Sequence, residues 1–187
     1  MSDLTITHAG NAVTRSADSP GSSISTARRR IIRITPTLDT ATYAAGDVVF
    51  NSVEIPNAVI GDGGCSKLIA MFIVNQITTL ADFDFIFSEN AGTLGSVNAT
   101  ANIGDAEIEA MNITGYLKLD SSEANTGNLD NSKIQRVFNN SNTENVSPIL
   151  LQAAPGSTSA YIAAIETSGV NPTFQVDSMD LVFHIEY

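Results

Sequence analysis

The sequence has few of the residues that form disulfides in secreted proteins or act as catalytic groups in many enzymes. Cys65 is the only cysteine among the 187 residues, which excludes a disulfide within the chain. Tryptophan is absent, and His8 and His184 are the only histidines. No apolar run is long enough for a membrane-spanning helix, and the first ten residues lack the basic and apolar segments of a secretory leader. We therefore expect a protein that is made in a cytoplasm, folds without redox help and has no membrane partner.

Charged residues are scarce and unevenly distributed along the chain. Residues 1–33 hold five arginines and two aspartates, a net charge of +3. Residues 34–187 hold four basic and eighteen acidic residues, a net charge of −14, and the two parts together give −11. The acidic part should repel nucleic acid, so we expect no nucleic-acid partner. A basic stretch beside an acidic body indicates two surfaces with different roles, although net acidity can also serve solubility alone.

The strongest hydrophobic pattern lies between Ser66 and Ser88. Lys67–Asn75 is apolar at both alternating sets of positions, which predicts a strand in the middle of a sheet that is covered on both faces. Asp82–Ser88 alternates three phenylalanines with polar residues, which predicts one face in a core and one face in water. Residues 76–81 contain neither glycine nor proline, so a loop should join the two strands. Together these strands predict the core of a β-sandwich.

The rest of the chain predicts more strands at intervals of about ten residues and a single short helix at Asp105–Met111. The expected strands are Ile31–Pro36, Val48–Ile55, Ile113–Leu119, Ser132–Phe138, Ser147–Gln152, Ala160–Glu166 and Met179–Tyr187. Asp120–Ser132 reads as a long acidic loop. Strands without alternating helices favour an all-β, antiparallel sandwich, jelly-roll-like rather than immunoglobulin-like. We expect an extended or disordered N-terminal arm at residues 1–27 and a β-sandwich domain at residues 28–187.

No motif in the sequence predicts catalysis. His184 shares a predicted strand face with Asp180 and Glu186, but a metal site would need a further ligand, and a solvated face is the simpler interpretation. Cys65 reads as a small buried filler. Two groups of acids could bind calcium, yet they fit solvated surfaces better and lack the EF-hand spacing; they are Asp82 with Asp84, and Asp120 with Glu123 and Asp130. We therefore predict a protein that is not an enzyme and uses no cofactor and no metal.

The one dense cluster of like charge is arginine, at the end of the predicted arm. Arg28, Arg29, Arg30 and Arg33 lie within six residues, and Arg15 lies in the arm itself. The guanidinium group of arginine makes bidentate contacts with carboxylates, so these five residues are candidates for docking to an acidic partner surface. The alternative is structural, because charges at the start of an edge strand prevent unwanted pairing.

The stretch Ile34–Val59 reads ITPTLDTATYAAGDVVFNSVEIPNAV. Its TPTLDT-x-Y-x-x-GDV-x-F run, followed by EIPNA, resembles small virion structural proteins of tailed bacteriophages, and the similarity extends to the closing strand. The resemblance implies a head decoration or cement protein that binds the major capsid protein on the capsid surface, commonly as a homotrimer. It implies no catalytic residues. The alternative is a tail- or fibre-associated module that binds a receptor or glycan, a reading weakened by the lack of tryptophan.

Overall fold

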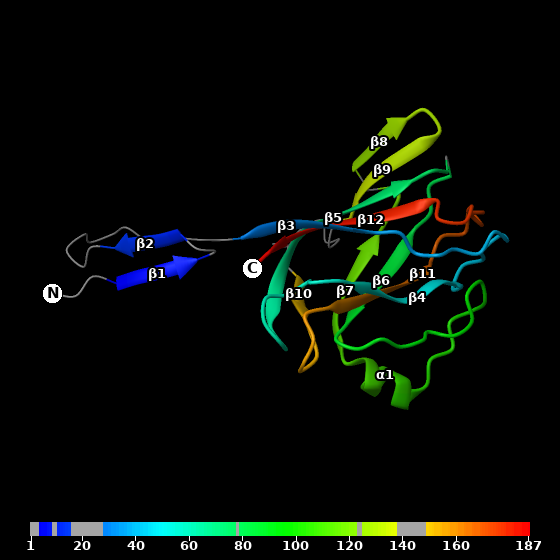
Figure 1. Ribbon diagram of the computed structural model, residues 1–187. Helices are drawn as coiled ribbons and strands as arrows, with labels where there is room; N and C mark the ends of the chain where they lie inside the picture. Colours follow the sequence, from blue (N-terminus) through cyan, green and yellow to red (C-terminus); the bar gives the residue numbers. More distant parts are fainter. Residues whose placement is uncertain (1–3, 9–10, 16–27, 78, 123–124, 138–148) are drawn as a thin grey trace.

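The computed structural model describes residues 4–8, 11–15, 28–77, 79–122, 125–137 and 149–187, with side chains from residue 28 onward except at Asn125. Two antiparallel sheets pack face to face, and a separate two-stranded hairpin precedes them in the chain (Figure 1). The larger sheet has the order β3-β12-β5-β9-β8, with β10 also paired to β5, and the smaller sheet has the order β4-β11-β6-β7. The strands of the larger sheet are β3 (Arg29–Ile34), β5 (Cys65–Asn75), β8 (Asn125–Leu129), β9 (Ser132–Val137), β10 (Ile149–Gln152) and β12 (Met179–Glu186). Those of the smaller sheet are β4 (Val48–Ile55), β6 (Phe83–Ser88), β7 (Ile113–Leu119) and β11 (Ala160–Glu166).

The two sheets confirm the predicted all-β sandwich. The chain crosses from one sheet to the other between β3 and β4, β4 and β5, β5 and β6, and β7 and β8, and again on either side of β11. The finer assignment to a jelly roll stays a prediction. The predicted loop at residues 76–81 is one of these crossings, because it links β5 of the larger sheet to β6 of the smaller one.

Strand β6 supplies the centre of the hydrophobic core. Phe83, Phe85 and Phe87 are fully buried, as their alternation with polar residues predicted. Phe83 lies beside Phe174, with ring centroids 6.2 Å apart, and Phe174 packs edge-on against Tyr43 at 5.4 Å. From the opposite sheet, β12 and β5 contribute buried apolar side chains to the same cluster, among them Phe183 and Ile73.

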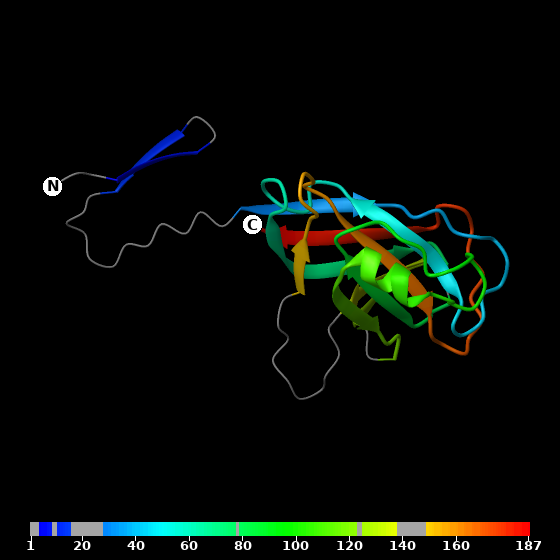
Figure 2. The ribbon, with the colours of Figure 1, turned by 90° about the horizontal axis from the view of Figure 1, so that it is seen from below.

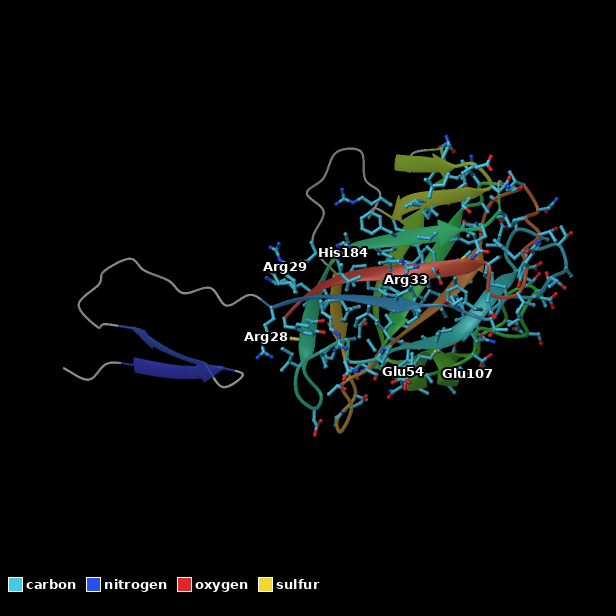
Figure 3. The ribbon with its side chains drawn as sticks, turned by 45° about the horizontal axis from the view of Figure 1, so that its top comes forward. Arg28, Arg29, Arg33, Glu54, Glu107 and His184 are labelled. Atoms are coloured by element: carbon cyan, nitrogen blue, oxygen red, sulfur yellow. The ribbon has the colours of Figure 1, made fainter. Side chains whose placement is uncertain are left out.

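In the part of the chain that the structure describes, β5 is covered on one face only, where the sequence predicted two covered faces. Met71 and Ile73 are buried in the core, whereas Phe72 and Val74 on the outer face are half-buried. The alternation also breaks, because Leu68 pairs with Ile185 and Ala70 with His184, so that Ile69 is an extra residue in the ladder. This bulge leaves Ile69 exposed. The strand is central in its sheet, but no described element lies over its outer face (Figure 3).

The outer face of the smaller sheet, in contrast, is covered. Helix α1 (Asp105–Met111), at its predicted position, lies with the loop before it against this sheet (Figure 2). Met111 and Leu94 form a second, smaller core with Val48 and Ala163 of the sheet. The helix starts at Gly104, whose backbone N–H donates to the Glu107 carboxylate at 3.0 Å.

Three sequence-based expectations differ from the structure in other places. Residues 4–8 and 11–15 form strands β1 (Leu4–His8) and β2 (Asn11–Arg15) of a hairpin, where only an extended or disordered arm was expected. The expected acidic loop contains β8, an edge strand whose sequence is too polar to show an apolar alternation. A tight turn joins β8 to β9, and Asp130 in this turn has a left-handed φ of 47°. Cys65, predicted to be buried, is exposed, because it begins β5 beyond the edge of the core.

The motif that carries the family resemblance forms a corner of the sandwich. Tyr43 is fully buried, and its hydroxyl accepts a hydrogen bond from the Asp39 backbone N–H at 2.8 Å. Gly46 takes a φ of 95°, which favours glycine, and Asp47 accepts a bond from the Ala44 N–H at 2.7 Å. These residues therefore hold the chain between β3 and β4.

Candidate docking surface

The arginine cluster lies on the edge strand of the larger sheet, at the end where the arm joins the sandwich. Among the described strands β3 pairs with β12 alone, and the last residue of the chain lies at the same end (Figure 1). The buried residues Ile32 and Ile34 alternate with Ile31 and Arg33, which are exposed. Arg30 occupies the inward-facing set of positions with Ile32 and Ile34, but it lies where the core ends and is exposed. It therefore stands at the open end of the sandwich.

Two of the candidate arginines are paired within the chain. The Arg29 Nε lies 3.1 Å from the Glu186 carboxylate, and an Arg33 guanidinium nitrogen lies 2.8 Å from the Asp180 carboxylate. Both pairs cross from β3 to β12 on the outer face, and both arginine side chains are more than half exposed. Such exposed pairs contribute about 0–1 kcal/mol to stability, so they orient the arginines more than they stabilise the fold.

Three of the arginines, including the paired Arg29, border a hollow that the sequence did not predict. This hollow, which we call the arm-end hollow, is open to solvent, measures about 690 Å³ and is lined by Arg28, Arg29 and Arg30 of the β3 segment. Its other lining residues come from distant segments and include Asn57, Ile60 and Tyr187. Figure 3 shows Arg28 and Arg29 at this end of the sandwich and Arg33 further along β3.

The walls of the arm-end hollow are held together by hydrogen bonds between these segments. The Tyr187 backbone N–H donates to the Arg28 carbonyl at 2.9 Å, and the Tyr187 hydroxyl donates to the Asn57 carbonyl at 2.7 Å. The Val59 N–H donates to the Thr158 carbonyl at 3.1 Å. The arginines and the apolar wall are therefore fixed relative to each other, a relation that no local sequence pattern could show.

The five predicted docking residues are thus only partly brought together. Arg28, Arg29 and Arg30 share the arm-end hollow, whereas Arg33 lies outside it on the sheet face. Arg15 ends strand β2, and its side chain lies outside the described part of the chain.

The other groups considered from the sequence do not form a metal site among the described residues. Asp180 and Glu186 bind arginines, while the His184 ring lies beside Phe72 with centroids 5.1 Å apart. Asp82 accepts a bond from the Ser121 N–H at 2.8 Å, and Glu123 lies outside the described residues. No group of three or more candidate ligands is close enough in the described ranges to hold a metal ion. None of the helices described is long and apolar enough to cross a membrane.

One buried carboxyl group is unusual. Glu166 is fully buried at the end of β11, and its Oε1 accepts bonds from the Ser168 N–H, at 2.8 Å, and from the Ser168 hydroxyl. Its Oε2 has no hydrogen-bond partner among the described residues. Burial raises the pKa of Glu166 above its ordinary value, the Ser168 bonds lower it, and the nearby Asp82 and Asp47 raise it further.

Glu166 should make stability depend on pH. The folded state holds the Glu166 proton at pH values where the unfolded chain has lost it, so this residue's contribution to stability falls as pH rises above 4.5, the ordinary pKa of glutamate. We expect Glu166→Gln to become more stable relative to wild type between pH 4 and pH 8 in urea unfolding. The exposed Glu109→Gln is the control. Parallel profiles for wild type and Glu166→Gln would contradict a raised pKa.

The fold and the surface together define an all-β sandwich with an arginine-lined hollow at the N-terminal end of β3. No protein-family model, curated protein or solved structure matches the chain.

Proposed function

We propose that the chain is a non-enzymatic virion structural protein, a decoration or cement protein that binds the major capsid protein on the outer surface of a phage head and stabilises the head. The observation that carries the proposal is the group of arginines where the basic arm joins an acidic sandwich. Three of them border one hollow, in a body whose net charge from residue 34 onward is −14. The resemblance of Ile34–Val59 to small phage virion proteins supports the same function.

The division of the chain suits a protein that is anchored at one end. A hairpin of two strands is marginal in water by itself, so β1 and β2 need a further surface for stability. Residues 16–28 separate β2 from β3 and can span about 45 Å when extended. In this proposal the arm reaches a neighbouring capsid or decoration subunit, and the arginines contact carboxylates at its root.

Within the proposal the protein is a homotrimer. The outer face of the larger sheet, over which no described element lies, supports self-association, because Phe72, Val74 and Ile134 are only half-buried there and Ile31 is 65% exposed. Light scattering of the free protein at micromolar concentration should give three times the chain mass of 19.7 kDa. A monomer mass would contradict this part of the proposal.

Occupancy on particles tests the function. Heads that lack the chain are incubated with the purified full-length protein, and bound copies are counted by quantitative mass spectrometry. We expect saturation at hundreds of copies per head, and a large loss of occupancy when residues 1–27 are deleted or when Arg28, Arg29 and Arg30 are changed to serine. The variants' binding should also depend less on salt than that of the wild type, because they lack the exposed ion pairs that salt screens.

The matched control removes three charges elsewhere. Lys67, Lys118 and Lys133 changed to serine alter the net charge equally but leave the arginine cluster intact. This variant should bind like wild type. Wild-type occupancy of the arm deletion and of the arginine variant would overturn arginine-mediated docking, and saturation at a few copies per particle would indicate a tail component instead.

A further inference from the structure

The arm-end hollow combines positive charge with an apolar wall. Ile60, in the turn that follows β4, is 51% exposed and faces the hollow, and Val59 and Tyr187 lie beside it. Arg30 lines the hollow, is exposed and has no ion-pair partner among the described residues, while Arg29 is already paired with Glu186. A ligand that satisfies both features must carry negative charge next to an apolar group.

The shape of the hollow favours a chain segment over a small molecule. A small ligand is held by burial of most of its surface, which needs an enclosed cavity, but this hollow is wide open. A peptide can lie across such an opening, place an apolar side chain on Ile60 and keep its carboxylates near the arginines. Because the rest of the body is strongly acidic, a polyanion as long as a nucleic acid would be repelled beyond the hollow.

We infer that the arm-end hollow binds an acidic peptide segment that places a large apolar side chain against Ile60 and a carboxylate against Arg30. This inference rests on the proposed function, in which the segment belongs to the capsid protein. The hydrogen bonds from Tyr187 to Arg28 and Asn57 hold the site in shape before binding, so little ordering of the protein is needed.

The test uses the full-length protein and a fluorescein-labelled peptide of ten residues in which aspartate and leucine alternate, followed by fluorescence anisotropy. We expect saturable binding that weakens with salt. Arg30→Glu should weaken binding about tenfold, the effect of losing one close charge pair, and Ile60→Ser about fivefold, the effect of losing part of an apolar contact. Peptides with lysine for aspartate, or serine for leucine, should bind at least tenfold more weakly.

The chain offers a matched control for each variant. Lys118→Glu makes the same charge change on the exposed surface of β7, and Val170→Ser makes a similar change at an exposed apolar residue in a loop. Both should bind within twofold of wild type, and circular dichroism checks that all four variants are folded. Absence of saturation, or equal weakening by Arg30→Glu and Lys118→Glu, would overturn the inference. So would tighter binding of a ten-residue oligothymidylate than of the acidic peptide.

The peptide experiment tests the hollow, and the particle experiment tests the capsid function, so each result can reject one proposal without the other. Peptide binding that depends on Arg30, together with no binding to heads, would leave the hollow as a peptide site and reject the capsid function. Binding to heads without peptide binding would keep the capsid function and reject the hollow as its contact.

Discussion

Replacing Phe85 with alanine should lower the free energy of unfolding by about 3–5 kcal/mol. Phe85 is fully buried at the centre of β6, between Leu117 of β7 and Ala164 of β11 in the ladder, and its ring lies 5.9 Å from that of Phe83. The substitution removes most of the side chain and leaves a cavity between two sheets, which rigid ladders cannot easily close. For a chain of this length the midpoint of thermal unfolding should fall by on the order of 10 °C.

Phe72→Ala is the matched control for this prediction. It makes the same chemical change on the outer face of β5, where Phe72 is only half-buried and lies against the His184 ring. Its effect should be less than half that of Phe85→Ala. Urea unfolding of the two variants, with the protein dilute enough to be monomeric, measures the difference directly. Equal effects would mean that the inner and outer faces of the sandwich are not distinguished as described.

Replacing Gly64 with alanine should destabilise the protein by about 3 kcal/mol, the upper end of the usual cost of overpacking. A Cβ at this position would lie 2.3 Å from the Ile60 carbonyl oxygen and 3.0 Å from that of Gly61. Both atoms belong to the backbone, and the Gly64 N–H bonds to the Gly61 carbonyl at 3.1 Å, so the turn must open to admit the methyl group. The opening would displace Ile60. Gly64→Ala should therefore bind the peptide at the arm-end hollow more weakly, in addition to being less stable.

The control for Gly64→Ala is Gly169→Ala. A Cβ at Gly169 meets no atom within 4 Å, and neither glycine has the positive φ that would penalise alanine by itself. Gly169→Ala should therefore leave the free energy of unfolding almost unchanged or slightly increased. Thermal unfolding of both variants decides the matter, and a shift of less than 2 °C for Gly64→Ala would contradict the tight turn.

On the outer face of the larger sheet, the burial observed in the structure differs from the burial that the apolar sequence pattern predicted. The alternating apolar residues of Lys67–Asn75 indicated a strand with two covered faces, but only one face is covered in the described part of the chain. An apolar strand face indicates that the face should be buried, but it does not indicate whether a segment of the same chain or another molecule buries it. The bulge at Ile69 also changes which residues share a face, and nothing in the local sequence marks it.

The sequence by itself determined the class of fold and the position of most strands, because alternation with a period of two is a local property of each strand. It also determined the helix at Asp105–Met111 and the phenylalanine core of β6, whose patterns are equally local. Only the tertiary structure decided which arginines lie together. It paired Arg29 and Arg33 with acids about 150 residues away and placed Arg30 and Ile60 in the lining of one hollow, because strand order and loop packing bring distant segments together at the end of the sandwich.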